Sequence, residues 1–299
     1  MAIIDTDPPL PTPARREHIP LGIAYMLGAT VMFAATSAAA KWLVETYPIG
    51  EVLFIRSVAS FAVCAAIVLP AAGLAAFHTR RPRAHIIRGL SQGTSQTLIL
   101  IAFSLMPLAS AIAINFSAPL FATLASALFL HERVGAARWT ALFIGLLGVL
   151  AITNPGTDTF QIGALFALGN AIMYGSVTAG VRGMTATEST ATLTMYQMMI
   201  LTAIFALMLP LGFVTPSAAD FAAMLLSGAA NGLGQYWWTR ALHLAPASAV
   251  SPFYYFSLVW AIALGFMFWG DLPTLSMLVG SAIVVGSGLF LLWRESGKK

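Results

Sequence analysis

The sequence is a succession of long apolar segments separated by short breaks rich in proline, glycine and asparagine, and this pattern restricts the fold more than any other feature. A helix that crosses the apolar core of a bilayer needs about 20 predominantly apolar residues. Ten segments fulfil this requirement: 20–42, 49–70, 85–106, 108–130, 136–153, 161–183, 190–212, 218–243, 246–269 and 273–293. The pattern predicts an all-α integral membrane protein with ten transmembrane helices and no separate soluble domain.

The composition agrees with a membrane protein and excludes several other classes. Only 9% of the residues are charged, whereas soluble domains carry roughly 25%. The single cysteine, Cys64, lies in an apolar segment, so neither a disulfide framework nor a Cys/His metal cluster can form. Residues 1–19 are proline-rich and lack the apolar core of a signal peptide, so we expect a disordered cytoplasmic N-terminal tail.

Lysine and arginine are distributed unevenly among the connections. With both termini on one side of the membrane, every Lys and Arg except Lys41 and Arg56 lies on that side. The connections on the opposite side carry Asp158, Asp220 and Asp271. Cytoplasmic loops carry an excess of Lys and Arg, so both termini are predicted to be cytoplasmic. These short basic loops make nucleic acid an implausible partner.

Two stretches in opposite halves of the chain carry the same spacing of side-chain amides. They are RGLSQGTSQTLILI at 88–101 and SGAANGLGQYWWTR at 227–240. Gln92 and Gln96 lie four residues apart in the first, and Asn231 and Gln235 occupy the same positions in the second. Residues four apart share one face of a helix, and an amide without a partner is costly in an apolar segment. The two stripes predict a polar cavity in the middle of the bundle.

Further correspondences divide the chain into two halves of five predicted helices. Residues 27–41 align with 168–182. A pair of glycines accompanies the amides in each half: Gly89 with Gly93, and Gly228 with Gly232. Such small-xxx-small pairs let helix backbones approach closely in a membrane. Because five is odd, the second half must be inserted in the opposite orientation, so 20–153 and 161–293 are predicted to form an inverted repeat, typical of alternating-access transporters. The alternative is a chance alignment of two Gly/Ala-rich halves.

Other polar and aromatic residues extend the predicted cavity. Asn170 and Tyr174 lie four residues apart in the sixth predicted helix, and Trp238 follows Gln235 in the eighth. A lining of amides, hydroxyls and aromatic faces suits a neutral or zwitterionic organic solute with apolar parts. Trp237 and Trp238 also fit an aromatic belt at the membrane interface, and we favour the belt for this pair.

Each half contains a proline within a predicted helix. Proline lacks the amide that would bond to the carbonyl four residues earlier, so Pro119 frees the carbonyl of Asn115, and Pro252 acts in the same way in the second half. Carbonyls without a helical partner are tolerated inside the bilayer where they line a water-filled cavity or bond to another protein group. Two interpretations stay open: hinges beside a binding site, with Tyr254 and Tyr255 close to Pro252, or ordinary membrane-helix prolines.

Charged residues within the predicted helices are few. Glu51 lies at the outer entry of the second helix and Arg56 lies five residues further in. A buried ionisable residue suggests function, but we favour snorkelling of Arg56, or its pairing with a carbonyl or a neighbouring acid. No Asp, Glu or His lies at the middle of a predicted span. This argues against an intramembrane hydrolase, which needs a nucleophile with a base, paired aspartates or zinc, and against a proton-driven antiporter.

Three motifs occur in a fixed order along the chain. They are FIRSVASF around Arg56, PLASAIAINFSAPLFATLASALFLHER at 107–133 with Ala111, Pro119 and Glu132, and APASAVSPFYYFSLVWAIALGFMFWGDLP at 245–273. In this order they resemble the drug/metabolite transporter superfamily, specifically its ten-helix EamA-type branch, over essentially the whole chain. Ser257 stands where the second copy would match Pro119, and Asp271 replaces a glutamate.

The resemblance implies a bacterial inner-membrane transporter that exports neutral and aromatic amino acids, works as a monomer and needs no cofactor or metal. Related branches carry S-adenosylmethionine, riboflavin, nucleotide sugars or cationic drugs, and these are alternatives. An intramembrane enzyme, a lipid scramblase or a selective channel are rivals from other classes. Substrate binding is predicted for Gln92, Gln96, Asn115, Asn170, Tyr174, Asn231, Gln235, Trp238, Tyr254 and Tyr255, with Pro119 and Pro252 as hinges.

Overall fold

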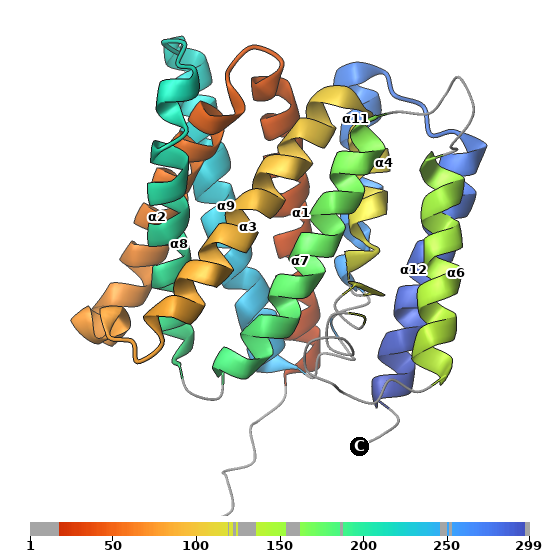
Figure 1. Ribbon diagram of the computed structural model, residues 1–299, viewed down its shortest axis with the longest axis horizontal. Coiled ribbons are helices and arrows are strands. Elements are labelled where there is room, and N and C mark those ends of the chain that lie inside the picture. The colour runs from red at the N-terminus through yellow and green to blue at the C-terminus, as the bar shows by residue number, and fades with distance from the viewer. Residues whose placement is uncertain are drawn as a thin grey trace, which may run out of the picture.

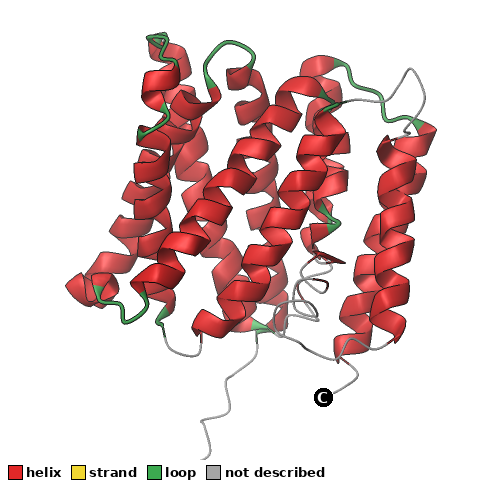
Figure 2. Cartoon of the chain, viewed as in Figure 1, coloured by secondary structure: helices red, strands yellow, loops and turns green. Residues whose placement is uncertain are grey.

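The computed structural model describes residues 18–118, 120, 121, 124, 136–153, 162–185, 188–245, 250 and 253–296. Within these residues the chain forms ten α-helices, two short 3₁₀-helices and no strand (Figure 1, Figure 2). The α-helices are α1 (Ile19–Val44), α2 (Ile49–Ala72), α3 (Pro82–Leu105), α4 (Leu108–Asn115), α6 (Ala136–Thr153), α7 (Gly163–Thr185), α8 (Thr190–Ala206), α9 (Ala218–Leu244), α11 (Phe256–Trp269) and α12 (Leu275–Ser296). The 3₁₀-helices are η1 (Gly73–Phe77) after α2 and η2 (Leu209–Leu211) after α8.

Most of the predicted segments are single helices, and local chemistry explains where they begin. Proline occupies the first turn of α3, where its missing amide would have no helical partner in any case. Ser217 caps α9, because its hydroxyl accepts a hydrogen bond from the amide of Asp220 at 3.1 Å. Ser189 caps α8 in the same way through the amide of Thr192 at 3.0 Å.

The predicted helices 108–130 and 246–269 are not continuous. α4 ends at Asn115, and the amide of Ser117 bonds to the carbonyl of Ile114, three residues back, at 2.9 Å. A proline at position 119 offers no amide to the carbonyl of Asn115, which explains why α-helical bonding stops here. In the second half, α11 begins only at Phe256. Pro119 and Pro252 lie outside the described residues, so their role as hinges stays a prediction.

Three helical segments are long and apolar enough to cross a membrane by length and composition: Ile19–Val44, Ile49–Phe77 and Ala191–Leu211. The other predicted spans fall short of this criterion among the described residues. α3 and α9 carry the polar stripes, and α4 and α11 are short. The outer surface is nevertheless apolar, with exposed side chains such as Leu147, Leu226 and Phe266. Apolar side chains that face outwards all round a helical bundle are typical of a protein embedded in lipid.

The helices pack into one bundle with α2 and α8 at one side and the pair α6 and α12 at the other (Figure 1). Between them, α1 packs along α9 and α3 packs along α7. The predicted glycines lie at such contacts: a Cβ on Gly228 of α9 would overlap the backbone carbonyl of Arg56 in α2, and one on Gly89 of α3 would overlap Ile200 in α8. α1 begins and α12 ends at the same end of the bundle (Figure 1); that this end is cytoplasmic stays a prediction.

Candidate substrate cavity

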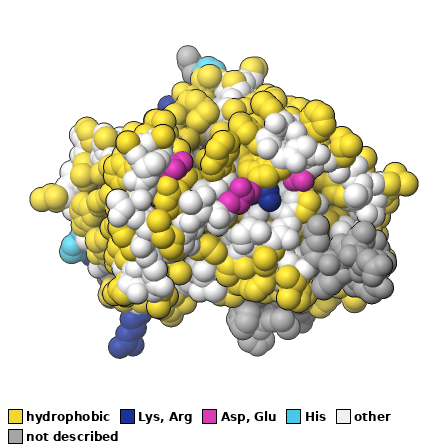
Figure 3. All heavy atoms as spheres, turned by 90° about the horizontal axis from the view of Figure 1, so that it is seen from above, with side chains coloured by type: hydrophobic (Ala, Val, Ile, Leu, Met, Phe, Trp, Pro, Cys, Tyr) yellow, Lys and Arg dark blue, Asp and Glu magenta, His cyan; other side chains and the backbone are white. Residues whose placement is uncertain are grey.

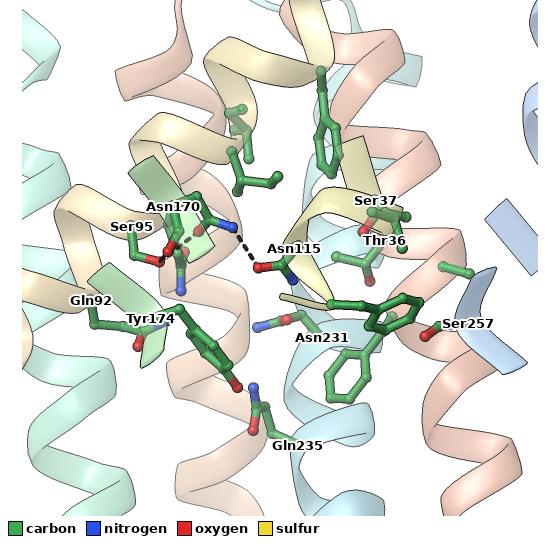
Figure 4. A pocket seen from close by; sticks show the side chains of 18 of the residues that line it. Thr36, Ser37, Gln92, Ser95, Asn115, Asn170, Tyr174, Asn231, Gln235 and Ser257 are labelled. Atoms are coloured by element: carbon green, nitrogen blue, oxygen red, sulfur yellow. Dashed lines mark hydrogen bonds between the residues drawn. The ribbon is translucent and has the colours of Figure 1, made fainter. Parts of the chain in front are cut away.

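A cavity of about 180 Å³ lies among the central helices, and α1, α2, α3, α4, α7, α9 and α11 contribute side chains to it. Pockets for drug-sized ligands usually measure roughly 300–1,000 Å³, so the cavity in this form suits a small solute. The predicted residues that line it are Gln92, Gln96, Asn115, Asn170, Tyr174, Asn231, Gln235, Trp238 and Tyr254. Figure 4 shows amide and hydroxyl groups from several helices pointing toward one common space.

Three polar side chains form a chain of hydrogen bonds along one wall of the cavity. The hydroxyl of Ser95 in α3 donates to Oδ1 of Asn170 in α7 at 2.6 Å. Nδ2 of Asn170 in turn donates to Oδ1 of Asn115, the last residue of α4, at 2.7 Å (Figure 4). Each end of the Asn170 amide is therefore satisfied by the protein, which fixes its orientation and ties together three helices.

The remaining amides differ in how far the protein satisfies them. Nδ2 of Asn231 donates to the hydroxyl of Ser60 at 3.2 Å, and that hydroxyl donates to the carbonyl of Gly228 at 2.7 Å. Asn231 is therefore held against α2. Gln92 and Gln96 line the cavity without a side-chain hydrogen bond to any residue that the structure describes. Their amides retain donors and acceptors for a solute.

Aromatic rings form the opposing wall. Tyr254 lies edge-on to Phe33 and to Phe116, with ring centroids 6.3 Å and 5.8 Å apart. Tyr255 does not line the cavity, so its predicted contact with the solute has no support in the geometry. Its ring packs behind Phe116 at 5.0 Å, and its hydroxyl reaches toward Gly288 in α12. Adjacent residues on a helix point in different directions, so residue spacing already argued against both tyrosines facing one solute.

The two adjacent tryptophans of α9 have different surroundings. Trp238 lines the cavity and packs near Met26. Trp237 instead lies against Gly28 of α1, where its ring meets that of Tyr25 at a centroid distance of 6.5 Å. The sequence analysis assigned both tryptophans to an aromatic belt at the membrane interface. The structure instead places Trp238 in the wall of the cavity.

Several lining residues were absent from the sequence-based prediction. They are Phe33, Thr36 and Ser37 of α1, Ser95 of α3, Phe116 after α4 and Ser257 of α11. The alignment of the two halves could have identified Phe33 as a lining residue, because it pairs Phe33 with Tyr174. Single serines and threonines carry no such signal, because in membrane helices they commonly bond to their own backbone.

Arg56 also lines the cavity. The predicted pairing with a carbonyl or a neighbouring acid is not found among the described residues, and the alternative of snorkelling stays a prediction. Its Nε and Nη1 atoms are buried and have no hydrogen-bond partner among the described residues. Glu51, on the same helix, does not reach it: Oε2 of Glu51 accepts from the backbone amide of Val214 at 2.9 Å. Arg56 is the only lysine or arginine among the described lining residues, which include no aspartate or glutamate.

A second buried cation, Lys41, lies in the last turn of α1. Nζ of Lys41 donates to the carbonyls of Phe103 and Met106 at 2.9 Å and 3.0 Å. It also lies 5.3 Å from the ring centroid of Trp269, whose Nε1 donates to Glu45 at 2.7 Å. Figure 3 views the bundle from above and shows acidic side chains gathered near a basic one in mainly apolar and uncharged surroundings.

Within the described part of the chain, no group of three or more His, Cys, Asp or Glu side chains is placed to hold a metal ion. The cavity offers amide and hydroxyl groups, aromatic faces and one guanidinium, which can bind and orient an organic solute. A bundle of apolar helices around such a cavity is typical of multi-pass membrane transporters.

The sequence profile of the EamA-like transporter family matches this chain twice, over residues 20–154 and over 161–293. The two matches together cover most of the sequence. The chain therefore belongs to the EamA-like transporter family, within the drug/metabolite transporter superfamily. One solved crystal structure shares the fold, with a TM-score of 0.63 and 20% sequence identity over 90% of this chain and 95% of the other.

Characterised relatives carry different metabolites. A riboflavin transporter of Rhizobium johnstonii is 29% identical over 92% of this chain and 92% of its own length. An S-adenosylmethionine uptake transporter of Rickettsia conorii is 26% identical, covering 92% of this chain and 93% of the relative. A pseudopaline exporter of Pseudomonas aeruginosa is also 26% identical, over 92% of this chain and 97% of the relative. The chain is thus a metabolite transporter by family, and these relatives do not single out amino acids.

Proposed function

We propose that this protein exports neutral and aromatic amino acids, and similar metabolites, across the bacterial inner membrane. The observation that carries the proposal is a small central cavity that combines amides, hydroxyls and aromatic rings with one guanidinium. Gln92, Gln96 and Gln235 would bind the polar groups of the solute. Tyr254, Trp238 and Phe116 would contact its side chain.

We further propose that transport proceeds by alternating access of two inverted halves. Two observations support this. The family profile matches each half separately. Helix contacts also occur in corresponding pairs: α1 with α9 and α7 with α3, α2 with α9 and α8 with α3, and α1 with α11 and α7 with α4. Where two repeats are related by a pseudo-two-fold axis, each contact between halves has such a counterpart. The two halves would rock about the breaks in the fourth and ninth helical segments.

Counterflow into proteoliposomes tests the function. Vesicles with the purified full-length protein would be loaded with unlabelled L-phenylalanine and given labelled L-phenylalanine without an ion gradient. Saturable accumulation would support an amino-acid carrier that needs no proton gradient to exchange. Flux that does not saturate and shows no counterflow would identify a channel instead. Folded protein without any amino-acid flux would contradict the proposal.

Two substitutions test the assignment of the cavity. Gln92→Leu and Gln235→Leu remove an amide from the lining, so each should reduce exchange by about tenfold or more, a loss of roughly 1.4 kcal/mol of binding. Ser104→Leu is the matched control, because Ser104 lies on the exposed side of α3 and bonds only to the carbonyl of Ile101. Wild-type exchange in both glutamine variants would exclude this cavity as the binding site.

The named relatives favour a second candidate, a carrier of riboflavin or S-adenosylmethionine. Both molecules are larger than an amino acid, so the cavity of about 180 Å³ would have to widen to admit them. Each compound would be added to the phenylalanine counterflow assay in excess. Inhibition by one of them at lower concentration than phenylalanine itself would make it the preferred substrate.

A further inference from the structure

Arg56 is a cation in a membrane helix whose buried nitrogens find no acceptor in the described structure. An unpaired charge in the apolar part of a membrane protein is costly, and such residues usually pair with each other or with backbone carbonyls. None of the described acidic side chains forms an ion pair with Arg56, although Oε1 of Glu51 is itself buried without a partner. Glu51 accepts from Val214, Asp220 from Tyr47 and Ser217, and Glu45 from Trp269.

Two of the neutral acceptors in the lining already accept hydrogen bonds from other residues. Among the lining residues, Oδ1 of Asn170 accepts from Ser95, and Oδ1 of Asn115 accepts from Asn170. No charged side chain among the described residues acts on Arg56 to offset its burial. The cavity therefore presents a positive charge with buried donors and lacks a described carboxylate of its own.

From this we infer that Arg56 is a specificity-determining residue that binds a carboxylate of the solute, so that the cavity selects molecules with an anionic carboxyl group. This inference rests on the proposed function. A guanidinium matches a carboxylate with two parallel hydrogen bonds. A single arginine neutralises one negative charge, which fits a monocarboxylate better than a doubly charged phosphate.

The same lining accounts for the rest of an amino acid. An ammonium group would have no carboxylate partner among the described lining residues, but the oxygens of Gln92 and Gln96 can accept from it. The faces of Tyr254 and Trp238 can attract it further. The carboxyl group is therefore the strictly required part of the solute, and the ammonium is held by weaker neutral contacts. Riboflavin carries no carboxylate and is disfavoured, whereas S-adenosylmethionine carries one.

Paired competitors in the phenylalanine counterflow assay test this inference. L-Phenylalanine and 3-phenylpropionate keep the carboxylate, whereas L-phenylalaninamide and 2-phenylethylamine lack it. The two acids should inhibit exchange at least roughly tenfold better than the amide and the amine, because a site with a buried donor rejects an analogue that leaves it unpaired. Equal inhibition by phenylalanine and its amide would overturn the inference.

Arg56→Gln and Arg56→Lys complete the test. Arg56→Gln should abolish the preference for acids, and Arg56→Lys should restore part of it, because lysine keeps the charge without the planar fork. Arg83→Gln is the matched control: it removes the same charge from an exposed position at the start of α3 and should leave the preference intact. An acid preference that survives in Arg56→Gln would assign recognition to another residue.

The carboxylate site can still be tested if the protein does not transport amino acids. If wild-type protein shows no phenylalanine counterflow, the proposed substrate is wrong. Thermal unfolding of the purified full chain then tests the carboxylate site with benzoate and benzamide at equal ionic strength. Benzoate should stabilise the wild type more than benzamide does and should lose this advantage in Arg56→Met. Equal effects of the two compounds on the wild type would overturn the inference.

Discussion

Lys41 in α1 and Arg56 in α2 are both cations within helices of the first half, but their surroundings differ. Lys41 is buried and donates to the carbonyls of Phe103 and Met106 at the end of α3, where the partial negative charge of a helix C-terminus gathers. Arg56 faces the cavity with buried nitrogens that lack a described partner. A cation whose donors the protein satisfies serves the fold, and one left unsatisfied beside a cavity remains available to a solute.

The largest expected effect is on stability. Lys41→Met would leave the carbonyls of Phe103 and Met106 without their donor, so we expect a loss of about 3 kcal/mol in the free energy of unfolding. Arg56→Met removes an unpaired buried charge, so its stability without solute should equal or exceed that of the wild type. Thermal unfolding in detergent measures both. Similar destabilisation of the two variants would remove the distinction between the cations.

The close contact between α2 and α9 gives the next effect. A Cβ at Gly228 would overlap the backbone of Arg56, so Gly228→Ala should force the helices apart and cost about 2 kcal/mol. It should also weaken phenylalanine exchange, because the backbone that carries Arg56 must shift. Gly286→Ala in α12 is the matched control, since an added Cβ there would meet no atom of a packed neighbour within 4 Å. Equal stability of the two variants would show that this contact is adaptable.

A third change gives the cavity a carboxylate of its own. Gln92→Glu places an acid among the same lining residues as Arg56, which would make this arginine resemble Lys41 in having protein acceptors. The new charge would repel a solute carboxylate, so phenylalanine exchange should fall by about tenfold, equivalent to roughly 1.4 kcal/mol. Gln92→Asn shortens the amide without adding charge and separates the two effects. If Gln92→Glu and Gln92→Asn lose the same amount of exchange activity, the added negative charge does not affect binding of the solute.

The smallest effect concerns Glu188, a hydrogen-bonded acid just before α8. The hydroxyl of Thr79 and the amide of Arg80 donate to Glu188, and with nearby His85 they hold the pKa of this carboxyl below its usual range. The resulting stabilisation is fully present above the unfolded-state pKa of about 4.3 and is lost as pH falls through the lower folded-state pKa. The difference in unfolding temperature between wild type and Glu188→Gln should therefore shrink on acidification. A difference independent of pH would show that Glu188 acts without its charge.

Local sequence patterns determined much of this protein. The apolar segments and the breaks between them, rich in proline, glycine and asparagine, predicted where most of the helices begin and end, because both signals depend on neighbouring residues alone. Amides spaced by four placed Gln92, Gln96 and Gln235 on faces that meet at one cavity. The inverted orientation of the halves, the cytoplasmic termini and the roles of Pro119 and Pro252 stay predictions.

Only the tertiary structure decided which of these residues are satisfied by the protein. Whether Lys41 meets the carbonyls of Phe103 and Met106, and whether Arg56 meets nothing comparable, depends on how helices distant in sequence approach one another. The same holds for Tyr255, which turns behind Phe116 although its neighbour lines the cavity. Residue spacing sets the face of a helix, but the partner that this face meets is set by the packing of the whole bundle.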